Sequence, residues 1–344
     1  MDLPIRMVRE APREPVIAVD GTFDSPGLNL SHWPGNRTPQ ELRHDLSTGS
    51  ALAFARLAPE RRAELARGCV AIANNHYDTD GLCALFAVRH PERALELERE
   101  LLDTARAGDL FAFPSERALA VDAIVAAYAD PVRSPIAAEL SGRDSLARHQ
   151  LATERLIELL PTLLTGDLEP WRALWGERVA RASAERAELA QCLRDDLVHL
   201  DWTVWTAKPS QFAAGAPGRH ALFGSTALDR VLFLKETPAG TLARFAINTL
   251  SWFDLPSRTP LPRPDLEALA VELNRLEGSE PTDAHAWRSQ PTGSPSPELW
   301  FGVRGLELFA EHNTALRPSR IPAATLRRLL AESQRDALVA ALPQ

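Results

Sequence analysis

Eight residues in the first quarter of the chain carry an unusual density of side chains that can do chemistry. Residues 74–81 read NNHYDTDG, which places two amides, one imidazole and two carboxylates within a short stretch. Carboxylate oxygens and imidazole nitrogens are the ligands that manganese, magnesium, iron and zinc take in proteins. His76, Asp78 and Asp80 are therefore candidate metal ligands. His76 is also a candidate catalytic acid or base, and Asn75 is a candidate contact to substrate.

The residues around this segment predict a strand before it and a buried helix after it. Residues 69–73 are a continuous apolar run, and residues 82–88 are apolar on nearly every side of a helix. A strand, a polar turn and a buried helix begin a β–α–β unit, which implies a parallel sheet. Ligands of such sheets bind at the carboxyl ends of the strands, and helix N-termini favour anions such as phosphate. A plain capping role for Asp80 also remains open, because Asp is common at helix starts.

A second apolar run offers partners for this segment. PVIAVDG, at residues 15–21, predicts a buried strand that ends in Asp20 and a turn. If this strand and the one that ends near residue 74 are parallel neighbours, Asp20 is a candidate metal ligand. An Asp before a Gly equally suits an ordinary turn. Residues 22–39 are rich in Pro, Gly and Asn and predict a long loop, in which His32 is a candidate ligand or general acid.

The rest of the pattern predicts two unlike halves. Thr38 and Glu41 form a capping box that predicts a helix running to about residue 66. Residues 115–200 are typical of helices throughout, and from residue 198 the pattern changes to aromatic and β-branched alternation. We therefore expect an α/β protein with two domains. Residues 1–197 would form a parallel-sheet half with a helical middle, and residues 198–344 a smaller α+β half.

Two cations of the C-terminal half are candidate contacts to a substrate anion. Lys235 and Arg244 lie on the two arms of a predicted β-hairpin around TPAG, and Lys235 is one of only two lysines in the chain. An isolated lysine in an arginine-rich protein suits a phosphate contact. A charge that protects an edge strand would explain the same residue.

Composition excludes several classes of protein. The 344 residues are 45% hydrophobic and 24% charged, which is typical of a globular protein. No apolar run predicts a membrane-spanning helix, and the N-terminus lacks the apolar core of a secretory signal. The net charge is −8 and the arginines alternate with acids, so duplex DNA is not an expected partner. Three widely spaced cysteines fit a reducing, cytoplasmic location.

The stretch CVAIANNHYDTDGLCALFAV, at residues 69–88, resembles motif one of the DHH phosphoesterase superfamily. In that superfamily an apolar strand runs into an Asp-x-Asp-Gly-like turn and then into a helix of small residues. The resemblance implies a DHH-like sheet, with Asp78 and Asp80 as metal ligands and His76 as a third ligand or neighbour. It also implies a metal-dependent phosphoesterase for a small phosphorylated or nucleotide-like substrate or a short oligonucleotide. The implied cofactor is manganese, with magnesium or zinc as alternatives.

Two other functions remain open. His76 and Asp78 also resemble the His-x-Asp of co-catalytic metallopeptidases, which implies a peptidase or amidohydrolase-like enzyme. Both resemblances imply metal-assisted hydrolysis, in which the metal lowers the pKa of bound water to about 7. The chain has no Asp-His-His triplet, which favours instead a non-catalytic binding or scaffold protein of this fold. A metal site requires that Asp20, His32, His76 and the two carboxylates of residues 78–80 converge within about 5 Å.

Overall fold

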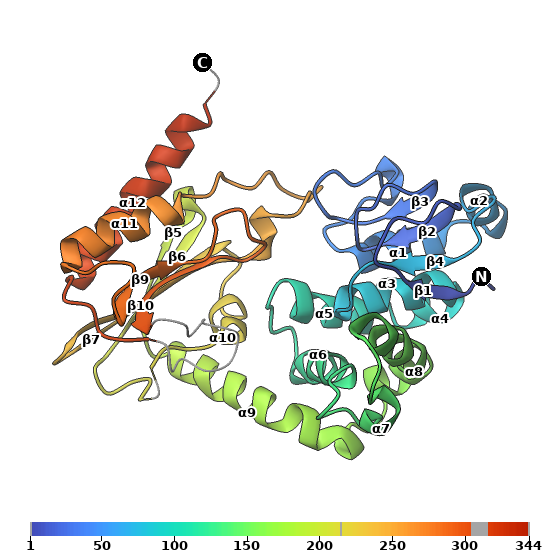
Figure 1. Ribbon diagram of the computed structural model, residues 1–344, viewed down its shortest axis with the longest axis horizontal. Helices are drawn as coiled ribbons and strands as arrows, with labels where there is room; N and C mark the ends of the chain where they lie inside the picture. The colour runs from blue at the N-terminus through green and yellow to red at the C-terminus, as the bar shows by residue number, and fades with distance from the viewer. Residues whose placement is uncertain (1, 214, 304–315, 343–344) are drawn as a thin grey trace. The chain divides into compact units, whose positions relative to one another are not determined.

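The computed structural model of the chain describes residues 2–213, 215–303 and 316–342. It is a mixed α/β structure that divides into two compact units (Figure 1). Unit 1 consists of Met1–Val179 and Phe253–Thr259, and unit 2 consists of Ala180–Trp252 and Pro260–Gln344. The predicted fold class is confirmed. The division falls after Val179 and not after residue 197, and a short later segment returns to unit 1.

Unit 1 is built on a four-stranded parallel sheet. Its strands, in the spatial order β1-β4-β2-β3, are β1 (Ile5–Met7), β4 (Ile72–Asn74), β2 (Val16–Val19) and β3 (Gly27–Leu30). β2 and β4 are direct parallel neighbours, with Ile17 beside Ile72. The carboxyl ends of these two strands therefore lie together at one edge of the sheet, as the sequence predicted.

β3 lies within residues 22–39, which we predicted to be loop throughout. It pairs in parallel with β2, from Val16 beside Gly27 to Val19 beside Leu30. Gly27 has a φ of 110°, and a Cβ on it would lie 2.3 Å from the carbonyl oxygen of Val16. The glycine therefore allows the close approach of two strands. The sequence around it is rich in Pro and Asn, which is typical of loops, and this is why we did not predict the four-residue strand.

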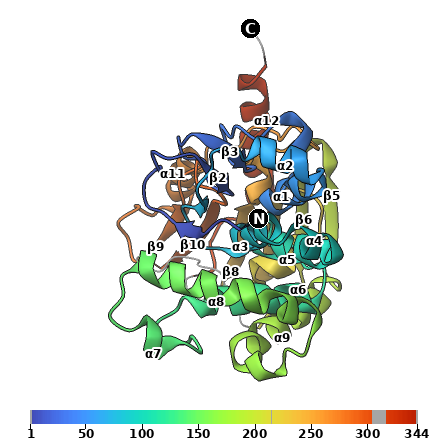
Figure 2. The same ribbon diagram turned by 90° about the vertical axis from the view of Figure 1, so that its right-hand side faces the viewer.

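The helices of unit 1 surround one buried helix. They are α1 (Ser47–Arg56), α2 (Pro59–Leu65), α3 (Thr79–Arg89), α4 (Pro91–Glu96), α5 (Glu98–Asp109), α6 (Glu116–Tyr128), α7 (Ala137–Leu140) and α8 (Ser145–Thr165), followed by the start of α9 (Arg172–Leu189). α3 contacts strands β2 and β4 and helices α1, α5 and α8 (Figures 1 and 2). Because α3 is buried on nearly every side, it is apolar all round, as predicted.

The predicted helix start at Thr38 is wrong. The hydroxyl of Thr38 donates a hydrogen bond to the carbonyl oxygen of Ser31 at 2.8 Å, and it accepts one from the Ser31 amide at the same distance. The side chain of Thr38 therefore links two parts of the loop by hydrogen bonds and does not cap a helix. The first α-helix of the chain begins at Ser47, and its start is set by Asp80, as described below.

Unit 2 is built on a six-stranded mixed sheet. Its strands, in the spatial order β5-β6-β7-β8-β10-β9, are β5 (Leu193–Leu197), β6 (Trp202–Ala207), β7 (Arg230–Thr237), β8 (Gly240–Ile247), β10 (Glu298–Val303) and β9 (His285–Ser289). The predicted β7–β8 hairpin is confirmed. β5 corrects the prediction that residues 115–200 are helical throughout, and as an exposed edge strand it shows no apolar alternation. Helices α11 (Leu266–Glu277) and α12 (Ala323–Ala340) pack on one face of the sheet, and α10 (Arg219–Phe223) precedes β7.

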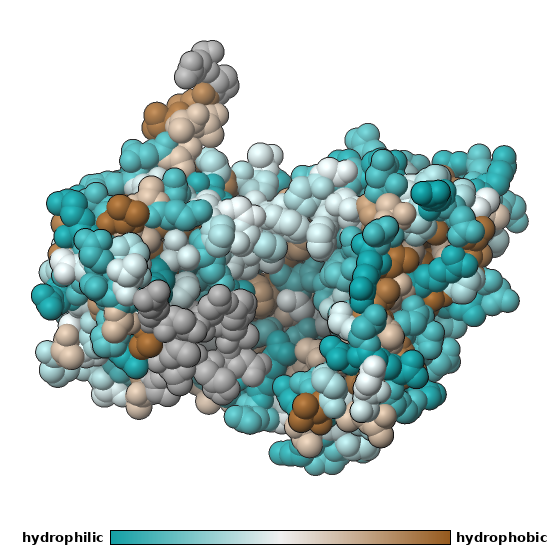
Figure 3. All heavy atoms as spheres, viewed as in Figure 1, coloured by the Kyte–Doolittle hydropathy of each residue, from teal (hydrophilic) through white to brown (hydrophobic). Residues whose placement is uncertain are grey.

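Arginines on the helices pair with nearby carboxylates at the surface. Such pairs, three or four residues apart, include Arg61–Glu64, Arg172–Glu169 and Arg328–Glu332. The face drawn in Figure 3 carries mainly hydrophilic side chains, with apolar ones scattered among them. The alternation of Arg and Glu therefore marks solvated helix faces at these places. Among the described helices, none has the length and apolar character that crossing a membrane requires.

Candidate metal centre

Asp20 lies at the carboxyl end of β2 in a conformation that few residues adopt. Its φ is 62°, in the left-handed region that Asp tolerates better than most side chains. The side chain is completely buried, and its Oδ1 accepts a hydrogen bond from the hydroxyl of Ser47 at 2.7 Å. Its Oδ2 lies 2.8 Å from Nε2 of His76, a nitrogen that it shares with Asp78. A buried carboxylate is costly without a positively charged partner, and the His76 imidazolium supplies that charge when no metal ion is bound.

Asp78 and Asp80 cap two different helices. Asp78 is the N-cap of α3, and its Oδ1 accepts from the amide of Gly81 at 2.9 Å. Asp80 lies in the first turn of α3, but its two oxygens accept from the amides of Ser47 and Thr48, at 2.8 and 2.9 Å. These amides belong to the start of α1, so the N-termini of α1 and α3 meet at the same place. The capping role considered for Asp80 is therefore real, although the helix it caps is not its own.

His76 lies between two carboxylates. Its Nε2 is 2.8 Å from Oδ2 of Asp20 and 2.9 Å from Oδ2 of Asp78. A ring nitrogen carries either one hydrogen or one lone pair, so it cannot make good hydrogen bonds to both oxygens. The other ring nitrogen, Nδ1, lies 2.9 Å from Oδ1 of Asn75. Asn75 thus orients the imidazole, a use that we did not predict for it, and its amide lies directly over Gly21.

His32 lies in a second and deeper group. Its Nε2 is 3.2 Å from Asp109, 3.6 Å from Asp20 and 3.7 Å from Asp80. The ring is completely buried, and its Nδ1 is 2.7 Å from the carbonyl oxygen of Asp45. If Nδ1 donates that bond, Nε2 presents its lone pair to the carboxylates, as in metal-bound histidines.

Two groups of potential ligands therefore share Asp20. One comprises Asp20, His76 and Asp78; the other comprises Asp20, His32, Asp80 and Asp109. Within each group one ligand atom per residue lies within 4.8 Å of all the others. Ligands at roughly 2.0–2.6 Å from one ion can be at most about 5 Å apart, so the donor sets fit a divalent cation. Carboxylates mixed with imidazole do not by themselves distinguish manganese from zinc or iron.

Asp109 is the ligand candidate that the sequence analysis missed. It is the last residue of α5, where a carboxylate opposes the helix dipole instead of complementing it. This unfavourable position, between Gly108 and an apolar run, was the available signal. Gly108 allows α5 to approach α3, because a Cβ on it would lie 2.9 Å from Cβ of Thr79.

The pKa values reflect an excess of negative charge. Burial, together with the charges of Asp78 and Asp80, raises the pKa of Asp20 to about 6. Burial and the same two charges raise the pKa of Asp109 well above its usual value. Although burial opposes it, the His76 imidazolium lowers the pKa of Asp78 to about 2. Without a metal ion, these carboxylates compete for the few cations available.

The two imidazoles are those cations. Burial lowers the pKa of His32, but the hydrogen bond and charge of Asp109, with the charge of Asp80, outweigh it and raise the pKa to about 9. For His76, the charges of Asp78 and Asp20 likewise outweigh burial and raise the pKa to about 12. Even with both rings protonated, four carboxylates outnumber two imidazoliums. A divalent cation is the natural replacement for the two protons.

The two groups differ in access from solvent. The side chains of Asp20 and His32 are fully buried, whereas that of His76 is 25% exposed and that of Asp78 is 36% exposed. A general acid must come within hydrogen-bonding reach of the substrate. The burial of His32 favours the ligand role over the acid role, both of which we predicted for it.

Lys235 and Arg244 lie in unit 2, and both are buried within its sheet. Nζ of Lys235 donates to the carbonyl oxygen of Phe212 at 3.0 Å. Arg244 donates to both carboxylate oxygens of Glu298, at 2.8 and 2.9 Å, and to the carbonyl oxygen of Pro217. β7 and β8 are interior strands, so the edge-strand explanation does not hold. These bonds give both residues a structural use within unit 2.

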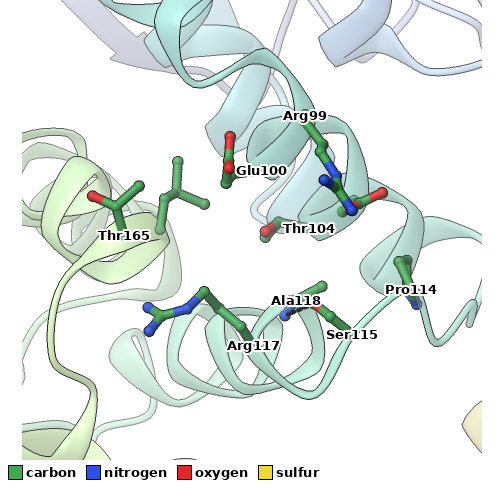
Figure 4. A pocket seen from close by; sticks show the side chains of 10 residues that line it. Arg99, Glu100, Thr104, Pro114, Ser115, Arg117, Ala118 and Thr165 are labelled. Carbon is green, nitrogen blue, oxygen red and sulfur yellow. Dashed lines mark hydrogen bonds and ion pairs between the residues drawn. The ribbon is translucent and has the colours of Figure 1, made fainter.

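A cavity in unit 1 is separate from these groups (Figure 4). It measures about 450 Å³ and lies between α5, the start of α6 and the end of α8. Its polar lining includes Arg99, Glu100, Asp103, Thr104 and Arg117, so positive and negative charges are mixed. None of its lining residues belongs to the two Asp/His groups, and we assign it no chemistry.

The whole chain matches one protein family. Residues 3–344 match the family described as "Family of unknown function (DUF6687)". The chain belongs to this family. No curated protein matches the chain. Membership of DUF6687 therefore implies no particular activity.

Proposed function

We propose that unit 1 is a divalent-metal-dependent phosphoesterase whose substrate is a small phosphorylated molecule or a short oligonucleotide. The observation that carries the proposal is the convergence of Asp20, His76 and Asp78 from the ends of two neighbouring parallel strands. The excess of carboxylates over imidazoles in the two groups favours a divalent cation over an ordinary ion-pair network. The resemblance of residues 69–88 to motif one of the DHH superfamily supports the phosphoester as the substrate.

The half-exposed group is the one that a substrate can reach. His76 and Asp78 would hold the ion from the accessible side, and Asp20 would hold it from beneath. A divalent ion there would supply Lewis-acid polarisation of a phosphoryl oxygen. Asn75 fixes the ring of His76 through Nδ1, and such support of a metal-bound imidazole tunes its affinity. Asp80 and Asp78 already cap the two helix N-termini at the site, so a substrate phosphate would be held by the ion itself.

Metal analysis is the first test of this proposal. Purified protein should retain manganese, zinc or iron after exhaustive desalting, or should show a rise in melting temperature when manganese is added to the EDTA-treated protein. Binding to the native state at 100 times the Kd stabilises it by about 2.7 kcal/mol. Absence of both bound metal and thermal shift would remove the phosphoesterase and peptidase hypotheses together.

Asp78→Asn is the sharpest substitution, because Asn is as good an N-cap as Asp but is a much weaker metal ligand. We expect a manganese Kd at least tenfold higher and loss of hydrolysis in a variant that still folds in EDTA. Asp144→Asn is the matched control, since Asp144 caps α8 in the same way through the amide of Ala147. If Asp78→Asn keeps wild-type turnover, the site has been assigned to the wrong residues.

A pair of chromogenic substrates separates the enzyme classes. We expect manganese-dependent hydrolysis of bis-nitrophenyl phosphate and none of an aminoacyl-nitroanilide. The reverse pattern would favour the metallopeptidase hypothesis. Tight metal binding without hydrolysis of either substrate would favour a binding or scaffold protein.

A further inference from the structure

A segment from late in the chain lies against the candidate metal centre. Residues 253–259 belong to unit 1, whereas Trp252 before them and Pro260 after them belong to unit 2. We call residues 253–259 the strap. It is the one stretch beyond Val179 that belongs to unit 1.

The strap packs an aromatic ring on a candidate metal ligand. The rings of Phe253 and His32 are stacked, with centroids 3.6 Å apart and planes inclined by 22°. Both side chains are buried, so no solvent separates the rings. Rotation of the imidazole out of its plane would collide with Phe253. The stacking therefore restricts the direction in which Nε2 of His32 points.

The strap also holds the backbone and the hydrogen-bond acceptor of His32. The amide of Asp254 donates to the carbonyl oxygen of His32 at 2.8 Å, and Oδ2 of Asp254 accepts from the amide of Gly35 at 3.0 Å. Further along, the amide of Ser257 donates to the carboxylate of Asp45 at 3.1 Å, and its hydroxyl bonds to the same carboxylate. Asp45 is the residue whose carbonyl oxygen lies against Nδ1 of His32. The strap thus contacts His32 at its ring, at its backbone and through its ring partner.

We propose that the strap is a positioning element of the metal centre, which holds the His32 imidazole in its ligating orientation. The inference rests on the proposed function and on metal binding by the deeper group of Asp20, His32, Asp80 and Asp109, which shares Asp20 with the substrate-accessible group. Supporting partners of metal-bound histidines typically change metal affinity by 10–100-fold when they are removed. Linkage is reciprocal, so a metal ion that fixes His32 must also hold the strap in place. Because both ends of the strap continue into unit 2, the chain connects unit 2 directly to a ligand of the metal.

The first test compares metal affinity with metal-free stability. Phe253→Leu keeps an apolar side chain at this buried position but removes the stacked ring. We expect its manganese Kd to rise on the order of tenfold. Thr259→Ala, an exposed position in the same strap, is the matched control and should leave the Kd unchanged. A merely structural role of Phe253 would lower the melting temperature of the EDTA-treated protein and leave the Kd of the folded protein as it was, which would overturn the proposal.

The second test uses the wild-type chain and does not depend on how the variant folds. Trypsin can cleave after Arg258, which is half-buried within the strap. We expect manganese to slow the appearance of the fragment that ends at Arg258 at least fivefold, and to have no such effect in Asp20→Asn. An equal cleavage rate with and without bound manganese would refute the positioning role of the strap but would not contradict the metal site. Failure of the wild-type protein to bind metal would overturn the proposed function and the strap with it.

Discussion

At the scale of single residues, the centre is a set of acids that destabilise one another in the absence of a cation. Asp20 has a pKa of about 6, whereas an unfolded Asp has one near 3.9. The folded protein therefore binds more protons than the unfolded chain between about pH 4 and 6, and its stability falls as the pH rises through that interval. For a shift of about two units, the loss from this one group is on the order of 3 kcal/mol.

The histidines act in the same direction at higher pH. His32 has a raised pKa of about 9, so the stability that its protonated form contributes is present below about pH 6.5 and is lost as the pH rises through 9. The lowered pKa of Asp78, about 2, acts the other way: it contributes stability above about pH 4, which is lost as the pH falls through 2. Between about pH 4 and 9, the carboxyl of Asp20 and the imidazoles of His32 and His76 all make stability fall as the pH rises.

We therefore predict that the melting temperature of the EDTA-treated protein falls as the pH is raised from about 4 to 9. A saturating amount of manganese should reduce this fall, because the metal replaces the protons that are lost. Asp20→Asn should flatten the part of the curve below pH 6 and weaken manganese binding. A metal-free protein that instead gains stability over this range would show that the acids are not crowded as described. Calorimetry across a series of buffers makes the measurement.

At the scale of elements, the site exists because two strand ends and two helix starts meet. The sequence supplied the clues for Asp20, His76, Asp78 and Asp80, because short apolar runs mark parallel strands and polar residues at their ends mark the ligand edge. It could not supply the partner of Asp80, which is a helix start 33 residues earlier along the chain. The capping box at Thr38 suggested a different helix start, because local pattern cannot distinguish a cap from a loop that is hydrogen-bonded to itself.

Gly81 shows how closely these elements approach. In an ordinary helix, Gly→Ala gains up to about 1 kcal/mol of stability. At Gly81 a Cβ would lie 2.2 Å from Nδ2 of Asn74 and 2.9 Å from Oδ2 of Asp20, so both side chains must move. We predict that Gly81→Ala lowers the melting temperature and raises the manganese Kd at least tenfold.

Gly176→Ala is the matched control for this substitution. Gly176 also lies inside a helix, α9, but a Cβ there would meet only the flexible side chain of Arg172, at 3.3 Å. We expect this variant to be as stable as the wild type or more stable, with unchanged metal affinity. If Gly81→Ala behaved like Gly176→Ala in thermal melting and metal titration, the close approach of Asp20 to α3 would be refuted.

At the scale of the whole molecule, the two units have separate sheets and separate cores. The change of pattern near residue 198 correctly indicated a second sheet. It did not indicate that helix α9 spans the boundary between the units, or that the first strand of this sheet, β5, lies before residue 198. The strap left no local signal, because a contact between residues 32 and 253 has no spacing that a pattern could reveal. Lys235 and Arg244 suggested a substrate contact because the sequence showed their charge and not their buried partners.

The strap makes a prediction about the response of the whole chain to metal. Because metal binding stabilises only the structure that holds the ligands, manganese should slow amide hydrogen exchange mainly in residues 20–36, residues 74–81 and the start of α1. Beyond Val179, the strap should be the one stretch protected to a similar degree, while β7 and β8 of unit 2 should exchange as before. Exchange measured by mass spectrometry, with EDTA and with manganese, resolves these peptides. Equal protection of the β7–β8 hairpin would mean that manganese slows exchange in both units alike. If manganese did not slow exchange in residues 253–259, the proposed role of the strap at the metal centre would be refuted.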